Sequence, residues 1–111
     1  MWEGCWDNGA GVRDTARGVF TEPDRIVVCS GFTQALALIA AALRRRGAGS
    51  VAVEAYGHRL HQTVLAEQGL RLDPIRVDHD GADVAALTDQ AAALVTPAHQ
   101  FPLGPALSAA R

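Results

Sequence analysis

Residues 25–46 constrain the fold most, because a strand pattern passes there directly into a helix pattern. The β-branched run Ile26-Val27-Val28 comes first, and the pair Ser30-Gly31 follows it as a turn. Apolar residues then recur at the spacing of one helix face. We therefore predict a buried strand over 25–30 and a helix over 32–46.

The rest of the chain repeats this alternation of strand patterns and helix patterns. The further predicted elements are a strand over 51–54, a helix over 58–68, a strand over 71–77, a short helix over 83–89 and a strand over 91–95. Strands that alternate with helices are typical of an α/β fold with a mainly parallel sheet. We expect a three-layer domain with helices on both faces of that sheet.

Turn-forming residues mark the ends of several elements. Gly47 and Gly69 follow the two longer helix patterns and are predicted to end them. Pro74 predicts an edge or irregular position in its strand, because proline cannot donate to a neighbouring strand. Residues 78–81 predict a turn and lack the further ligands of a calcium loop. Residues 107–111 are expected to begin another helix.

Residues 1–20 differ from the rest of the chain in composition. They hold both Trp residues and several Gly, and they show no periodicity. We expect residues 1–20 to be an irregular or poorly ordered arm, and residues 21–111 to form the domain.

Length and charge limit the classes of function. The 111 residues allow one domain or part of one. A net charge of −2 predicts no nucleic-acid surface, and Arg44–Arg46 is better read as the basic end of a helix. No stretch is long and apolar enough to span a membrane. Cys5 and Cys29 form no disulfide framework, and we expect Cys29 in the core of a cytoplasmic protein.

Three polar segments are expected to meet at one edge of the sheet. They are Ser30–Gln34, Glu54–His61 and Thr96–Gly104, and each follows a predicted strand. Ligands of parallel sheets bind beyond the carboxyl ends of the strands. The N–H groups at residues 31–34, together with the Thr33 hydroxyl, could bind a phosphate at the helix start. The alternative is an ordinary turn whose Thr and Gln cap the helix.

Three other residues in these segments allow more than one interpretation. Tyr56 and His58 could place a flat ring over a heterocyclic ligand, or they could be an exposed Tyr and a His that opens a helix. His58 and His61 are three residues apart on the predicted helix, which could bring them to one metal ion, but the sequence suggests no third ligand.

In combination and order, four segments resemble the large domain of fold-type-I pyridoxal-phosphate (PLP) enzymes. The resemblance covers about residues 21–111 and is nearest to class I/II aminotransferases, in particular to the aminotransferase-like domain of MocR-type bacterial regulators of the GntR family. The segments that carry it are Ile26–Leu36, Val51–His58, Val77–Gly81 and Leu94–Gly104.

The resemblance implies roles for individual residues. It implies that the phosphate of PLP binds at Gly31, Phe32, Thr33 and Gln34, and that His58 stacks on the cofactor ring. The family's Pro-Thr-Gly loop matches Pro102-Leu103-Gly104, and Phe101 takes the place of an Asn found in many aminotransferases. Ala55-Tyr56 replaces the family's Asp-Pro before the stacking ring.

Two catalytic parts of that family have no counterpart here. The chain contains no Lys for a Schiff base, and the family's Asp that pairs with the pyridine nitrogen lies further along its sequence. The resemblance therefore implies a truncated, incomplete PLP-transferase-like domain, with weak or absent PLP binding and no catalytic activity of the chain alone. In the full-length family it implies a homodimer that takes an amino-acid substrate or effector.

Two alternatives to the family reading stay open. The chain could be a free-standing α/β module that binds a phosphorylated ligand without catalysis, or a structural piece without a ligand. If it is part of a larger domain, strand 25–30 lacks its neighbours and leaves an open edge. We then expect marginal stability or association when the chain is expressed alone.

Overall fold

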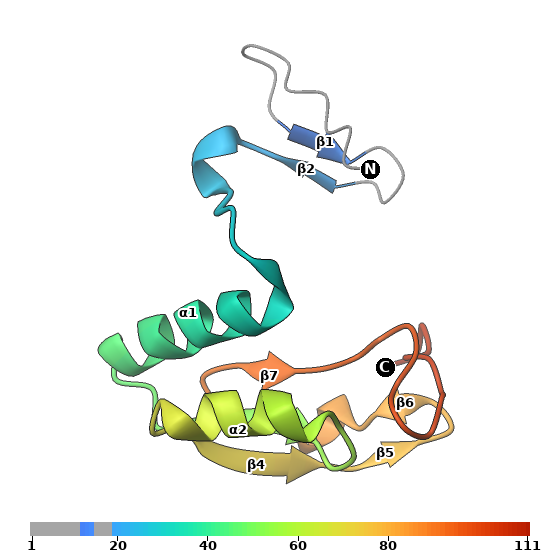
Figure 1. Ribbon diagram of the computed structural model, residues 1–111. Coiled ribbons are helices and arrows are strands. Elements are labelled where there is room, and N and C mark those ends of the chain that lie inside the picture. The colour runs from blue at the N-terminus through green and yellow to red at the C-terminus, as the bar shows by residue number, and fades with distance from the viewer. Residues whose placement is uncertain (1–11, 15–18) are drawn as a thin grey trace.

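The computed structural model describes residues 12–14 and 19–111 (Figure 1). Its centre is a parallel sheet in the order β4-β3-β7, formed by Arg71–Ile75, Ser50–Glu54 and Ala93–Leu94. Ala52 lies opposite Asp73 on one side and Ala93 on the other. The predicted α/β class and parallel sheet are confirmed, and Pro74 lies on an edge strand as predicted.

Two α-helices pack against the sheet, α1 (Gly31–Arg45) and α2 (Arg59–Glu67). Both contribute to one apolar cluster with alternate residues of β3. Its buried members are Leu36, Ala40, Val51, Val53, Leu65 and Leu70. The helices predicted over 32–46 and 58–68 are therefore confirmed. The two helices share one face, however, so in the described part of the chain the expected helix layer on the second face is not present.

The second face of the sheet is covered by a hairpin and the C-terminal segment. The hairpin joins β5 (Val77–Asp78) to β6 (Gly81–Ala82). Its Ala82 packs with Ala52 and Ile75 of the sheet and with half-buried Leu107. The predicted strand 71–77 is thus two strands, β4 and β5, separated at Arg76.

Gly81 is required where the hairpin meets the C-terminal segment. Its φ angle is +93°, in the region that favours glycine, and an added Cβ would lie 2.8 Å from the Cα of Leu107. The Leu107 N–H donates to the Pro97 carbonyl at 2.8 Å, and the Ser108 N–H donates to the Asp80 carbonyl at 3.0 Å. These long-range bonds hold residues 107–111 in an irregular conformation, so the helix expected there is wrong.

The short helix expected over 83–89 is also wrong. Only a 3₁₀ turn, η2 (Val84–Ala86), forms in this segment. The side chain of Gln90 ends it, because its Oε1 accepts the N–H of Thr88 at 2.9 Å. The polar residues after Ala86 thus bond locally instead of continuing a helix.

The clearest correction concerns residues 25–30, which do not form a strand. Arg25 ends a 3₁₀ turn, η1 (Pro23–Arg25), and residues 26–29 are irregular. Val27 is 77% exposed and Val28 is 84% exposed. A strand needs a neighbour for its backbone N–H and C=O groups, and no described strand lies beside these residues. Cys29 is half-buried rather than part of the core.

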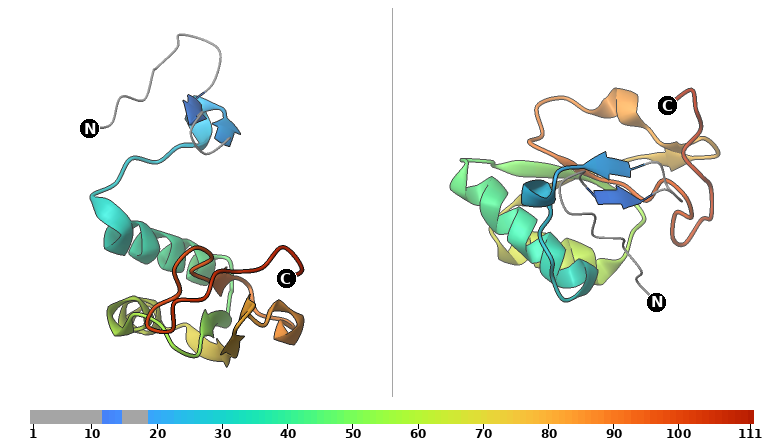
Figure 2. Two further views of the ribbon diagram at one scale, coloured as in Figure 1. Left: turned by 90° about the vertical axis from the view of Figure 1, so that its right-hand side faces the viewer. Right: turned by 90° about the horizontal axis from the view of Figure 1, so that it is seen from above.

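The described part of residues 1–20 is more regular than expected. Strand β1 (Val12–Asp14) pairs in antiparallel fashion with β2 (Val19–Thr21), with Val12 opposite Thr21. The expected irregular arm is therefore wrong for these strands, while residues 1–11 and 15–18 lie outside the description. Figure 2 shows this hairpin set apart from the sheet and its helices. Neither α-helix in the described ranges has the length and hydrophobicity to cross a bilayer.

Candidate ligand-binding site

A cavity of about 310 Å³ lies at the carboxyl ends of β3 and β7. The start of α1 contributes Phe32, the segment after β3 contributes Gly57 and His58, and the segment after β7 contributes Thr96 and Pro97. The predicted meeting of three segments at this edge of the sheet is therefore confirmed. Its cause is topological, because parallel strands direct their carboxyl ends to one edge.

The start of α1 holds the four residues assigned to the phosphate, and all four are exposed. Gly31 has a φ of +85° with open space beside its Cα, which leaves its backbone accessible. The first N–H groups of an α-helix have no intrahelical acceptor. Of the four residues, Phe32 lines the cavity; Gly31, Thr33 and Gln34 lie outside its lining.

Gln34 does what the capping alternative proposed for it. Its Oε1 accepts the backbone N–H of Ser30, the N-cap residue, at 2.5 Å. This bond satisfies a backbone donor at the helix entry and engages the side-chain oxygen of Gln34. Phosphate binding at Gln34 would therefore use its backbone, while the exposed Thr33 hydroxyl remains available.

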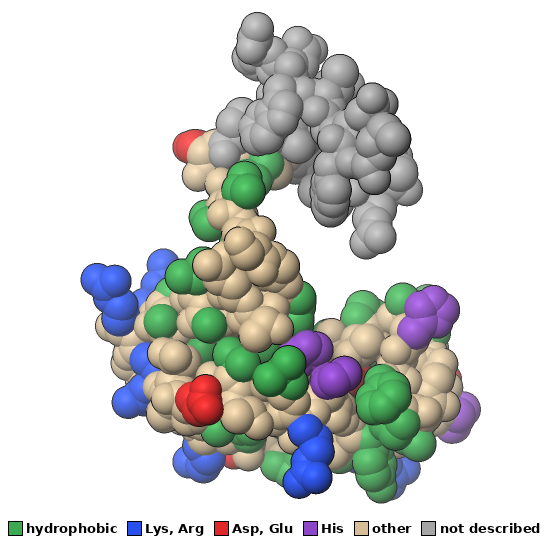
Figure 3. All heavy atoms as spheres, viewed as in Figure 1, with side chains coloured by type: hydrophobic (Ala, Val, Ile, Leu, Met, Phe, Trp, Pro, Cys, Tyr) green, Lys and Arg blue, Asp and Glu red, His purple; other side chains and the backbone are tan. Residues whose placement is uncertain are grey.

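Four rings gather around the mouth of the cavity. The centroids of Phe32 and His61 lie 4.7 Å apart in an edge-to-face arrangement. His58 lies 5.0 Å from His61 and 5.6 Å from Phe101. Figure 3 shows histidine side chains beside hydrophobic ones near the start of α1. His58, predicted to stack on a ligand ring, thus lies in an aromatic cluster.

His61 titrates differently from a solvated histidine. Partial burial, and secondarily the nearby charge of His58, lowers the pKa of His61 below its ordinary value of 6.5. The neutral form of this imidazole is therefore more favoured than that of a solvated histidine. His61 was weighed from the sequence only as a metal ligand, and its ring contact with Phe32 was not predicted.

Glu54 is a site residue that sequence reasoning did not select. It is the last residue of β3, lines the cavity and is only 5% exposed. Its Oε1 accepts the N–H of Thr96 at 3.0 Å, which ties the ends of β3 and β7 together. The available signal was a carboxylate at the end of the otherwise apolar strand Val51–Val53.

Gln100 positions the loop beside the cavity and was likewise not selected. Its side chain is almost fully buried, and its Nε2 donates to the carbonyls of Tyr56 and Phe101. Its Oε1 accepts the N–H of Leu103 at 3.3 Å. One amide therefore fixes the loop after β7 against the loop after β3, and holds Phe101 near His58.

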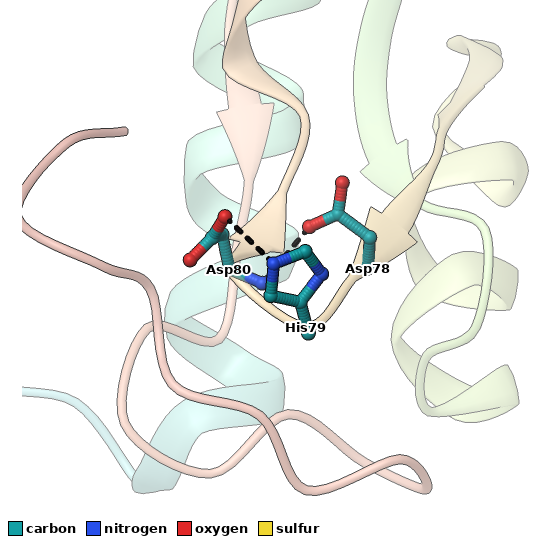
Figure 4. A group of neighbouring side chains, drawn as sticks. All are labelled: Asp78, His79 and Asp80. Carbon is teal, nitrogen blue, oxygen red and sulfur yellow. Dashed lines mark hydrogen bonds and ion pairs between the residues drawn. The ribbon is translucent and has the colours of Figure 1, made fainter.

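The turn at residues 78–80 forms as predicted (Figure 4). Ligand atoms of Asp78, His79 and Asp80 lie within 4.8 Å of one another. The Asp78 carboxylate is nevertheless engaged, because it accepts the Asp80 N–H at 2.9 Å and pairs with Arg111 at 2.5 Å. These two partners, in that order, lower the pKa of Asp78. The group therefore serves to hold the C-terminal segment on the hairpin.

A larger cavity, about 540 Å³, lies at the opposite ends of the strands. Its charged lining residues are Arg46, Arg71 and Asp89, and all three are exposed. Exposed charges of this kind are solvated, and their ionic contacts contribute little free energy. The cavity at the carboxyl ends is the better candidate, because it combines rings with a buried carboxylate.

Comparison with known proteins does not assign the chain to a family. No known family model matches its sequence, and no curated protein is similar to it.

Proposed function

We propose that this chain is part of a PLP-binding, aminotransferase-like domain, of an aminotransferase or of a MocR-type regulator. One observation carries the proposal: the start of α1 and the ring of His58 meet at one cavity beyond the carboxyl ends of the sheet. That edge of a parallel sheet is where such folds bind ligands.

The residues present fit the cofactor in part. Backbone N–H groups at Gly31–Gln34 and the helix dipole suit a phosphate, and the space beside Gly31 leaves room for it. In this proposal the ring of His58 lies against the pyridine ring, and its position in the cavity lining supports that role. When bound through a lysine, PLP acts as an electron sink, but this chain has no Lys, so binding here is non-covalent.

The exposed segment before α1 favours part of a larger domain over a self-contained module. Val27 and Val28 have the residue type of a buried strand, yet they are solvent-exposed. In the family that the sequence resembles, later strands lie beside the first one. A neighbour of that kind would explain a β-branched run that is unpaired in the described chain.

PLP binding to point variants tests the phosphate site. Thr33→Ala should weaken PLP binding by roughly 1 kcal/mol, the contribution of one hydrogen bond, and Gly31→Val should weaken it more by obstructing the backbone. Thr63→Ala is the matched control, because Thr63 is an exposed α2 residue whose hydroxyl bonds to the Arg59 carbonyl. If Thr33→Ala and Gly31→Val bind PLP like the parent, the assignment is wrong.

Comparison of three ligands separates the proposal from its alternatives. PLP should raise the melting temperature more than pyridoxal or inorganic phosphate, since it alone engages both the helix start and the ring. An equal shift with inorganic phosphate would favour a module for phosphorylated ligands. The absence of a shift with all three would favour a structural role.

Borohydride reduction in the presence of PLP tests the non-covalent mode. No internal peptide should carry a pyridoxyl group, because only the α-amino group of Met1 offers a primary amine. Peptide mass spectrometry reads this out. A pyridoxyl adduct on any internal peptide would contradict the proposed mode of binding.

A further inference from the structure

The buried carboxylate of Glu54 has no cationic partner in the part of the chain that the structure describes. Its one polar contact there is the Thr96 N–H at 3.0 Å, and none of the described ion pairs includes it. The other carboxylates that lose solvent differ in this respect, because Asp73 pairs with Arg71 and Asp78 pairs with Arg111.

Burying a carboxylate without a cationic partner costs free energy of folding, because burial removes water without supplying an opposite charge. One N–H donor offsets only part of that cost. Among the described residues that line the cavity there is no Arg, and burial lowers the pKa of its His61. The described walls therefore offer the Glu54 carboxylate no guanidinium partner.

The residues of this cavity are not arranged to bind a metal ion. Glu54, His58 and His61 line the same cavity, but their ligand atoms do not form a group close enough to hold one ion; among the described residues only Asp78, His79 and Asp80 do. The remaining walls include the apolar side chains of Val53 and Leu94 and the ring of Phe32, beside the polar residues Gln62 and Thr96. Such walls suit an organic ligand with a flat apolar body.

We infer that this cavity binds a small organic cation, whose ammonium or amidinium group pairs with Glu54 and whose flat apolar body lies among Phe32, His58 and His61. A cation beside aromatic faces is further stabilised by their quadrupoles. The inference concerns the cavity proposed for the cofactor and shares His58 with it, but it rests on a different residue, since the phosphate of PLP is assigned to the start of α1 and Glu54 ends β3.

Calorimetric titration of the whole chain with benzylamine, at pH 8 and without PLP, tests the inference. Benzyl alcohol is the neutral probe of nearly the same shape. Benzylamine should bind at least about tenfold more tightly than benzyl alcohol, as expected for a charge-assisted hydrogen bond. Equal affinity for the two probes, or no binding of benzylamine, would overturn the inference without touching the phosphate assignment.

A second experiment repeats the two titrations with the variant Glu54→Gln. Its amide oxygen can still accept the Thr96 N–H, so this hydrogen bond is kept while the charge is removed. Benzylamine affinity should fall about tenfold and benzyl alcohol affinity should stay unchanged. Glu67→Gln makes the same change at an exposed position of α2 outside the cavity lining. If both substitutions weakened benzylamine binding equally, the cause would be a long-range charge effect, and the assignment to Glu54 would be overturned. If Glu54→Gln unfolds, the comparison of benzylamine with benzyl alcohol in the parent protein still tests the inference.

Discussion

Two β-branched segments of this chain look alike in sequence and differ in structure. Residues 26–29 read Ile-Val-Val-Cys, and residues 51–54 read Val-Ala-Val-Glu. The second segment is the fully buried central strand β3, with a parallel neighbour on each side. The first is irregular, with Val27 and Val28 exposed and its two end residues half-buried. The difference teaches that strand propensity selects a candidate, while a hydrogen-bonding neighbour decides whether a strand forms.

The largest expected effect is in the cluster behind β3. Leu65→Ala should reduce the free energy of unfolding by about 2–5 kcal/mol, because Leu65 is 1% exposed and its removal leaves a cavity. Chemical denaturation measures the change. Leu60→Ala, on the same helix but exposed, should cost less than about 0.5 kcal/mol. Similar costs for both would mean that this core is not packed as described.

Hydrogen exchange compares the two segments directly. The Ala52 amide donates to the Ala92 carbonyl at 2.9 Å within the sheet. It should exchange at least about a hundredfold more slowly than the amides of Val27 and Val28, which are open to solvent. Slow exchange at Val27 and Val28 in the isolated chain would show that they form a strand after all, and would favour a self-contained module.

A matched pair of valine substitutions sharpens the comparison energetically. Val53→Ala should cost about 2 kcal/mol, because Val53 is 4% exposed in the centre of the sheet. Val28→Ala should cost less than about 0.5 kcal/mol. The shift in the denaturant midpoint measures both losses of stability, provided that the slope of the free energy of unfolding against denaturant concentration stays constant. A larger cost at Val28 than at Val53 would contradict the structural difference.

The smallest effect concerns the solvent-facing rim of the sheet. The hydrogen bond from Arg71 lowers the pKa of Asp73 to about 2. Because the folded-state pKa lies below the ordinary 3.8, this pair stabilises the fold above about pH 4, and the contribution is lost as the pH falls towards 2. In Arg71→Gln the pKa of Asp73, followed by NMR, should rise towards 3.8. Arg59→Gln removes one positive charge from α2 and should leave the pKa of Asp73 unchanged. If Arg59→Gln also raised the pKa of Asp73, the net charge of the protein and not the Arg71 hydrogen bond would be the cause.

Local chemistry made part of this fold predictable. The helices end at Gly47 and Gly69, as predicted, because their positive φ angles allow the last N–H groups to turn back onto the helix. The turn at Asp78–Gly81 forms for a similar local reason, since Asp78 accepts the Asp80 N–H. These elements depend on residues within one turn of each other.

The candidate site was predictable in location but not in composition. Strand order and direction bring Phe32, His58 and Thr96 to one edge, and alternation of strands and helices already implied that edge. The buried partners Glu54 and Gln100 could not be selected, because their bonds reach residues more than 40 positions away. Sequence spacing does not encode which backbone groups such side chains will meet.

The sequence by itself determined both helices with their ends, the three strands of the parallel sheet, and the sheet edge where the three polar segments meet, because these follow from periodicity and local backbone preference. Only the tertiary structure decided that both helices share one face and that, within residues 12–14 and 19–111, residues 26–29 have no strand neighbour and buried Glu54 has no cationic partner. The physical reason is that burial and pairing depend on neighbours distant in the chain, and local preference is too weak to specify them.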